Sequence, residues 1–174
     1  MQNSLQRLIM LGNAGGGKST LARRIGQHLG LPVVHLDLLF WETDWKEANT
    51  GIFRERVRNA LTGDKWVCEG NYAKKTFDLR LPRADAVIWL DTSRTTCTRR
   101  VLMRSVLNKP RPDLPLGCSE KLDAEFLKFL RFTWNFDRST RPGIERERLE
   151  VGPAVPVISL SGEATIAAYL KSIG

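Results

Sequence analysis

A glycine-rich stretch near the start of the chain carries the clearest chemistry in the sequence. Residues 12–20 read GNAGGGKST and match the phosphate-binding pattern G-x-x-x-x-G-K-[S/T]. Glycines let the backbone turn so that successive N–H groups face phosphate oxygens. The lysine places positive charge on the β- and γ-phosphates, and the serine hydroxyl can ligate Mg²⁺. We therefore expect a site for ATP, with GTP as an alternative, formed by Gly12, Asn13, Ala14, Gly15, Gly16, Gly17, Lys18, Ser19 and Thr20.

Two carboxylates follow short apolar stretches and could work beside this loop. Asp37 comes after an expected strand at 33–36, and Glu69 comes after an expected strand at 66–68. Ligands of doubly wound sheets bind beyond the carboxyl ends of the strands, so both side chains would face the loop. Asp37 could be a general base or bind a phosphate acceptor, or it could cap a helix or turn. Glu69 could hold Mg²⁺ through water, or it could be a turn carboxylate before Gly70.

The elements that would position these groups alternate between strand and helix. Apolar runs predict strands at 7–11, 33–36, 66–68, 86–90 and 155–160. Helical spacing predicts a helix from the glycine-rich loop to Gly30, and further helices at 50–62, 94–107, 119–136, 143–150 and 163–173. This order predicts an α/β fold with a parallel sheet, in a single domain that spans residues 1–174.

Aromatic residues crowd the segment that follows Asp37. Phe40, Trp41 and Trp45 show no clean period, and exposure of so large an apolar surface is costly. The segment favours core packing for Phe40 and the wall of an acceptor pocket for Trp41.

A second irregular segment lies at 108–117 and contains three prolines and two basic residues. It is too rich in proline for a helix or a central strand, and the expected helices on both sides predict a short flap rather than a domain linker. Closure of this flap would carry Arg111 onto the phosphates, with Arg138 and Arg141 completing the clamp from beyond the following helix. The alternative is that Arg111 is an ordinary solvated loop residue.

The composition narrows the range of partners. The net charge is +8, and residues 94–141 alone hold eleven lysines and arginines against five acidic residues. Such a stretch could face DNA, serve the phosphates of nucleotides, or be a merely solvated surface. No apolar run approaches the roughly 20 residues that span a membrane. Three widely spaced cysteines and two histidines favour reduced thiols in a cytoplasmic protein and argue against a zinc site.

Several further motifs in fixed order make the chain resemble a known family. Beside the glycine-rich loop they are His35-Leu36-Asp37, Phe40-Trp41, Glu69-Gly70-Asn71-Tyr72, Arg83-Ala84-Asp85, Ile88-Trp89-Leu90-Asp91, Arg111-Pro112-Asp113, Gly117-Cys118 and Glu125-Phe126-Leu127. With them the chain resembles the adenylate-kinase-like P-loop kinases, and within these the bacterial DNA topology modulation proteins, which are regarded as small kinases.

The resemblance implies a five-stranded parallel sheet of order 2-3-1-4-5, an acceptor site over 37–72 and a lid over 104–119. It implies that Arg100 and Arg104 are the paired arginines that enter the lid, and that Glu69-Gly70 stands where nucleotide kinases have Asp-Gly. Nucleotide kinases follow that motif with Phe-Pro-Arg, whose arginine binds the phosphate of the acceptor. This chain has Asn71-Tyr72-Ala73 there instead and so lacks that arginine.

The function expected from these observations is Mg²⁺-dependent phosphoryl transfer from ATP to a small molecule. The acceptor would be a nucleoside, a nucleotide or a hydroxyl-bearing metabolite, and the missing acceptor-phosphate arginine favours a hydroxyl. Lys18, Asp37, Glu69, Arg104, Arg111 and Arg138 would serve catalysis, Ser19 and Glu69 would hold the metal, and Arg100 would bind the nucleotide. The alternative is a nucleotide-binding, DNA-associated protein that modulates DNA topology.

Overall fold

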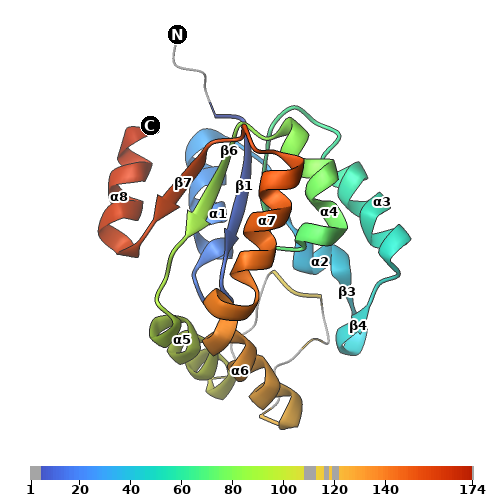
Figure 1. Cartoon of the computed structure of the whole chain (residues 1–174), viewed down its shortest axis with the longest axis vertical. Coiled ribbons are helices and arrows are strands. Elements are labelled where there is room, and N and C mark those ends of the chain that lie inside the picture. The colour runs from blue at the N-terminus through green and yellow to red at the C-terminus, as the bar shows by residue number, and fades with distance from the viewer. Residues whose placement is uncertain (1–4, 108–112, 116–117, 119–121, 174) are drawn as a thin grey trace.

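A parallel sheet forms the centre of the protein in the computed structural model, which describes residues 5–107, 113–115, 118 and 122–173 (Figure 1). Its order is β2-β5-β1-β6-β7, and every neighbouring pair runs parallel. Counted along the chain, the strands of this sheet lie in the predicted order 2-3-1-4-5. Their bounds are Arg7–Gly12 (β1), Val33–His35 (β2), Trp66–Glu69 (β5), Ala86–Leu90 (β6) and Val157–Leu160 (β7).

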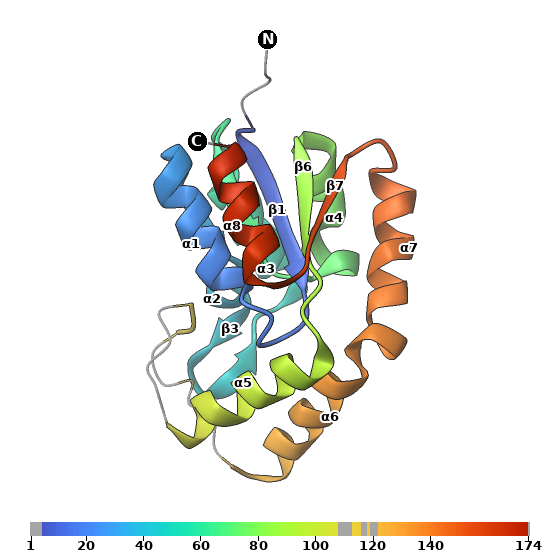
Figure 2. The same ribbon diagram turned by 90° about the vertical axis from the view of Figure 1, so that its left-hand side faces the viewer.

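The central strands are covered on both faces, which explains their near-continuous apolar sequences. Ile9 of β1 pairs with Cys68 of β5 on one side and with Val87 of β6 on the other, and all three are fully buried. On one face the sheet packs against α1 (Lys18–Leu29) and α8 (Gly162–Ser172). On the other face it packs against α3 (Thr50–Ala60), α4 (Ala73–Arg80) and α7 (Arg141–Val151). The two helical layers stand on opposite sides of the sheet in Figure 2.

Two helices lie beyond the carboxyl ends of the strands instead of on a face. They are α5 (Arg94–Val106) and α6 (Ala124–Ser139), and they form the lower part of the molecule in Figures 1 and 2. Two cation–π contacts join them, one from Arg94 to the ring of Trp134 and one from Arg104 to the ring of Phe129. This placement brings α5 and α6 to the edge of the sheet where the glycine-rich loop emerges.

Several element boundaries differ from the prediction. The second strand ends at His35, because Leu36 is already the first residue of a short helix, α2 (Leu36–Phe40), and Asp37 lies in its first turn. The helix expected from Ser119 begins at Ala124, since the side chain of Asp123 accepts a hydrogen bond from the backbone of Phe126 and caps that end. Ser119 itself lies outside the described residues.

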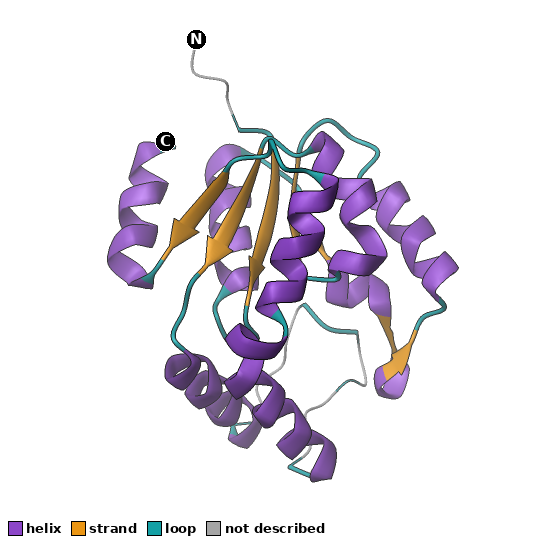
Figure 3. Ribbon diagram, in the orientation of Figure 1, coloured by secondary structure: helices purple, strands orange, loops and turns teal. Residues whose placement is uncertain are grey.

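Some elements were not predicted at all. Helix α4 is one, and a small antiparallel hairpin made of β3 (Trp41–Glu42) and β4 (Lys46–Glu47) is another (Figure 3). Short 3₁₀ helices cover Thr43–Trp45 and Leu81–Arg83. Among the described residues no helix is both long and apolar enough to cross a membrane.

Candidate functional site

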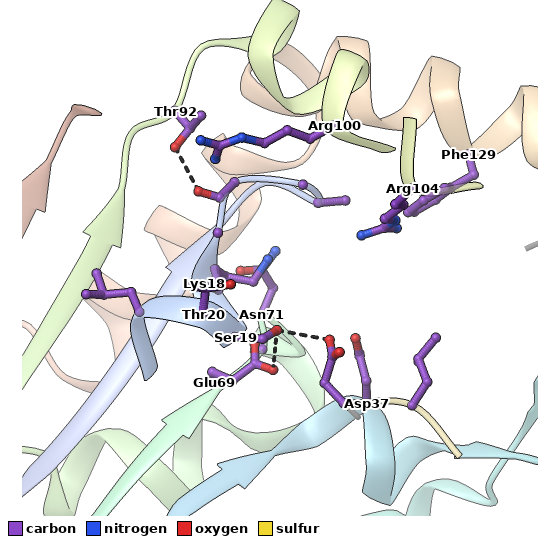
Figure 4. A pocket seen from close by; sticks show the side chains of 18 of the residues that line it. Lys18, Ser19, Thr20, Asp37, Glu69, Asn71, Thr92, Arg100, Arg104 and Phe129 are labelled. Carbon is purple, nitrogen blue, oxygen red and sulfur yellow. Dashed lines mark hydrogen bonds between the residues drawn. The ribbon is translucent and has the colours of Figure 1, made fainter. Parts of the chain in front are cut away.

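A cavity of about 1500 Å³ opens at the carboxyl ends of the strands. It is lined by the glycine-rich loop and the start of α1, by the end of β5, by α2 with the β3–β4 hairpin, and by α5 and α6. Figure 4 shows side chains from these separate elements pointing into one space. Most of the residues that the sequence singled out therefore meet in one place.

The loop at 12–17 has the close packing and backbone turns of a phosphate cradle. Gly12, Gly15 and Gly17 have positive φ angles. A Cβ at Gly15 would lie 2.5 Å from the carbonyl oxygen of Cys97 in α5, so no other residue fits there without a shift of backbone. The hydroxyl of Thr92 donates to the carbonyl oxygen of Gly16 at 3.0 Å, which fixes the loop against the chain after β6.

Lys18 reaches back over this loop from the first turn of α1. Its Nζ donates to the carbonyl oxygen of Asn13 at 2.9 Å, and both residues belong to the predicted nucleotide site. The Asn13 side chain is buried and donates to the carbonyl oxygen of Thr133 in α6 at 2.7 Å. The start of the loop is thus attached to α6, while the ammonium group of Lys18 lies at the cavity where phosphates would bind.

Ser19 and Glu69 lie together, as expected for a pair that serves one metal. The Ser19 hydroxyl is 3.0 Å from Oε1 of Glu69, and Nδ1 of His35 is 2.7 Å from the same oxygen. Burial alone would raise the pKa of Glu69, but the His35 hydrogen bond and the charge of Lys18 outweigh it and hold that pKa below its ordinary value. An ionised Glu69 accepts, so Nδ1 of His35 carries the proton.

This donor set fits Mg²⁺, which takes one or two protein oxygens and keeps several waters. Ser19 supplies a hydroxyl oxygen and Glu69 a carboxylate held ionised, and both face the cavity in Figure 4.

A third carboxylate joins this pair and was not assigned a role from the sequence. Oδ2 of Asp113 is 3.0 Å from the Ser19 hydroxyl, and Asp113 is only 6% exposed. It comes from the segment beyond α5, far from Ser19 along the chain. The only signal in the sequence was its place in the Arg111-Pro112-Asp113 motif.

Two further residues had no role assigned from the sequence: Asn71, which was named only as part of the Glu69-Gly70-Asn71-Tyr72 motif, and Arg80, which was not named. The Asn71 side chain makes two hydrogen bonds with Gly12, accepting from its N–H at 3.2 Å and donating to its carbonyl oxygen at 3.0 Å. Arg80 is fully buried and donates to the carbonyl oxygens of Gly70 at 3.0 Å and Asn71 at 2.6 Å. Arg80 and Asn71 therefore connect the loop after β5 to the base of the phosphate cradle.

Asp37 faces the cavity from the side opposite α5. Its Oδ1 accepts a hydrogen bond of 2.6 Å from the Tyr72 hydroxyl. Burial, followed by the charge of Asp37 and this hydrogen bond, raises the pKa of Tyr72, so the phenol remains a donor. Trp41 lines the cavity as the sequence suggested, while Phe40 is buried in the core.

The predicted arginines divide into two groups. Arg100 and Arg104 line the cavity and project from α5 toward the glycine-rich loop in Figure 4. Arg138 is exposed in the last turn of α6 and does not line the cavity. Arg141 pairs with Asp91 at 2.9 Å and lies over the ring of Trp89, so it packs on the sheet. Arg111 lies outside the described residues, as does half of the predicted lid at 104–119.

Comparisons with known proteins concern the sequence as a whole and the fold. No protein-family model matches the chain. A cytidylate kinase from Pyrobaculum aerophilum is 35% identical over 109 residues, and this chain spans 57% of that relative's length while 53% of the chain is matched. The match to DNA topology modulation proteins stays a prediction.

Two solved structures resemble nearly the whole chain. A shikimate kinase from Acinetobacter baumannii in complex with shikimate gives a TM-score of 0.57 at 20% identity, over 98% of this chain and 92% of that one. A gluconokinase from Sinorhizobium meliloti 1021 gives 0.54 at 14% identity, over 99% and 91%. At such identities the likeness concerns the fold. The sheet order, the glycine-rich loop and these neighbours together show that the chain has the α/β fold of the P-loop kinases.

Proposed function

We propose that the protein is a Mg²⁺-dependent kinase that transfers the γ-phosphoryl group of ATP to a hydroxyl group of a small molecule. The observation that carries the proposal is one continuous cavity lined by Lys18 and Ser19 on one side and by Asp37 and Tyr72 on another. A donor and an acceptor bound in one cavity can meet in line, and such positioning supplies much of the rate in phosphoryl transfer.

The cations around the loop support the donor half of the proposal. Lys18 and the backbone N–H groups of 13–18 would bind the β- and γ-phosphates, with Arg100 and Arg104 reaching them from α5. Ser19, and Glu69 through water, would hold Mg²⁺, which neutralises charge on the phosphates when bound. GTP could use the same contacts, because they address phosphates and not the base.

The acceptor half supports a hydroxyl over a phosphate. Within 37–72, all of it described, no lysine or arginine lines the cavity, so an acceptor phosphate would meet no cation from this region. Asp37 would take the proton of the acceptor hydroxyl. The oxygen of that hydroxyl would bond to the γ-phosphorus, while the bond between the γ-phosphorus and the oxygen of the leaving ADP breaks. The Tyr72 hydroxyl orients the Asp37 carboxylate for that step.

Transfer of labelled phosphate from γ-labelled ATP tests this function directly. The protein would be incubated with Mg²⁺ and a panel of nucleosides, nucleotides, sugars and amino alcohols, with Lys18→Ala as the inactive control. We expect at least one hydroxyl compound to be labelled by the wild type and not by the variant. If Mg·ATP failed to bind, or if nucleoside monophosphates were the only acceptors, so that nucleoside diphosphates were the only labelled products, the proposal would be wrong.

A further inference from the structure

The acceptor end of the cavity is lined by carboxylates and aromatic rings. The carboxylates are those of Asp37, Asp44 and Glu47, and the rings are those of Trp41, Trp45 and Tyr72. All six come from α2, the β3–β4 hairpin and the loop after β5. Opposite them lie the cations Lys18, Arg100 and Arg104, which belong to α1 and α5.

The negative charges act on a common space. Burial is the main cause of the raised pKa of Tyr72, and the charges of Asp37, Glu69 and Glu47 add to it. Tyr72 therefore lies within the field of three carboxylates. A positively charged ligand group beside this ring would be favoured by the same field, and an anionic group would be opposed by it.

Nearby cations are engaged away from the cavity. Arg54 pairs with Asp78 at 2.6 Å, and Arg56 pairs with Glu42 at 3.3 Å. The Lys75 ammonium group donates to the Thr50 hydroxyl at 3.2 Å and lies over the ring of Phe40. None of these three lines the cavity.

The aromatic rings form a corner suited to a cation. The ring centroids of Trp41 and Trp45 are 5.3 Å apart with planes at 80°, and Trp41 meets the buried Phe40 edge-on at 4.9 Å. Phe40 in turn contacts Tyr72 at 4.8 Å, so the corner is anchored to the core. Indole faces attract ammonium groups through their negative π surface.

The backbone here takes conformations that most side chains avoid. Asp44, Trp45 and Tyr72 have φ angles of 61°, 59° and 32°, and they are the non-glycine residues with positive φ in the described chain. All three line the cavity. The hairpin holds two of them in place through the pairing of Trp41 with Glu47 and of Glu42 with Lys46. Such conformations are unfavourable for residues other than glycine and are found mainly where function requires a particular side-chain direction.

We propose that the acceptor is a hydroxyl compound that also carries a protonated amine, bound between the carboxylates of Asp44 and Glu47 and the indoles of Trp41 and Trp45. This inference rests on the proposed function and narrows its acceptor to an amino alcohol in the broad sense, such as an amino sugar or an aminated nucleoside. The amine would sit in the acidic, aromatic corner while the hydroxyl lies between Asp37 and the γ-phosphate.

Binding of three ligands that share one ring and differ in charge tests the corner itself. Benzylamine, benzyl alcohol and benzoate would be titrated by calorimetry in EDTA without nucleotide, so that neither a metal nor ATP contributes. Wild type would be compared with the double variant Asp44→Asn/Glu47→Gln, because asparagine tolerates the left-handed backbone as aspartate does. Glu55→Gln, exposed on α3 and away from the cavity, is the matched control.

We expect benzylamine to bind about tenfold more tightly than benzyl alcohol, and benzoate more weakly than either. The double variant should reduce the preference for the amine to within about threefold, and the control should keep it. Equal binding of benzoate and benzylamine, an unchanged preference in the double variant, or no binding of any of the three would overturn the inference.

Turnover separates this inference from the proposed function. Matched sets of amino alcohols, neutral alcohols and hydroxy acids would be offered with Mg·ATP. Amines as the best acceptors would support both proposals. Phosphorylation that favours the hydroxy acids would contradict the inference that the acceptor carries an amine, and it would still support the proposed kinase activity. Absence of all phosphorylation with the amine preference intact in calorimetry would overturn the kinase and leave the corner as a site that binds amines.

Discussion

Asp113 and Glu69 contact the same hydroxyl, that of Ser19, each at 3.0 Å. A residue of the segment beyond α5 thereby reaches the position that we assign to the metal. We expect Asp113→Asn to raise the Mg²⁺ concentration for half-maximal ATP turnover about tenfold, because one negative charge beside the cation is lost. Titration of activity with MgCl₂ measures this, and an unchanged midpoint would show that Asp113 does not assist the metal.

Glu69→Gln should have the same direction and a larger effect. The variant keeps the shape of the side chain and can still meet Ser19 and His35, but it removes the carboxylate that water-bound Mg²⁺ would contact. Retention of full turnover in excess EDTA would contradict a metal role for both Ser19 and Glu69. Circular dichroism should accompany the measurement, since Glu69 is almost fully buried.

Lys18→Ala should abolish detectable turnover, because it removes the main cation at the β- and γ-phosphates. Lys18→Arg is the useful companion, since a guanidinium keeps the charge and cannot reproduce the 2.9 Å contact to the carbonyl oxygen of Asn13 in the same geometry. Equilibrium binding of a fluorescent ATP analogue would be compared in the three proteins. Wild-type affinity and rate in Lys18→Ala would remove the basis for a phosphate-binding loop.

Arg104→Ala should lower kcat about a hundredfold with less effect on the KM for ATP, as for a charge that acts mainly on the transition state. Arg99→Ala provides the control, because Arg99 lies on the same helix and is exposed away from the cavity. Equal kinetics in the two variants would leave Arg104 a packing residue on Phe129. The corresponding expectation for Arg111→Ala, a loss of about a hundredfold at saturating ATP, stays a prediction from the sequence.

Asp85 gives a test of stability against pH. It accepts hydrogen bonds from the backbone of Gln6 and Arg7 and from the Arg7 guanidinium, all within 2.9 Å. Burial would raise its pKa, but these contacts lower it, so the carboxylate stabilises the fold above its ordinary pKa. That stability is lost as the pH falls through the lowered pKa.

We expect Asp85→Asn to cost about 1–3 kcal/mol at pH 7 and to flatten the fall in stability below about pH 4. Urea unfolding at several pH values would measure both. An equal acid dependence in the variant and the wild type would show that other groups control it.

A DNA-binding measurement distinguishes the proposed kinase from the DNA-associated alternative. Part of the basic stretch at 94–141 is used inside the protein, since Arg94 stacks on Trp134 and Arg141 pairs with Asp91. We therefore expect duplex DNA to bind weakly, without base preference, and with an affinity that falls steeply with salt. Sequence-selective binding at nanomolar concentration in physiological salt would favour the alternative over a kinase.

Sequence patterns were sufficient where burial and local conformation agree. The runs that form β1, β5 and β6 are buried on both faces, and the glycine-rich loop dictates the turn that connects β1 to α1. Helix α4 was not predicted because two of its buried positions, which are usually apolar, are occupied by the polar residues Thr76 and Arg80. The β3–β4 hairpin escaped it because Asp44 and Trp45 adopt positive φ without glycine.

Contacts between distant segments explain the rest of the differences. The approach of Asp113 to Ser19 and of Asn71 to Gly12 depends on how the chain returns to the carboxyl edge of the sheet, which no local pattern encodes. Arg138 and Arg141 were expected to complete the clamp because they follow the helix after the flap, but neither of them lines the cavity.

The acceptor end of the cavity is built mainly by α2 and the β3–β4 hairpin, and the other elements build the rest of the site. This division bears on how the substrate of such a protein could change in evolution. Most side chains at the acceptor end lie within 37–47, on α2 and on the hairpin that follows it. The hairpin makes its own strand pairing, and α2 meets the core through Phe40. Exchange of that one stretch would alter which compound is accepted while the parts that hold ATP stay as they are. Substrate choice in this fold would then be a property of a single replaceable segment, open to recombination in nature and to grafting in the laboratory.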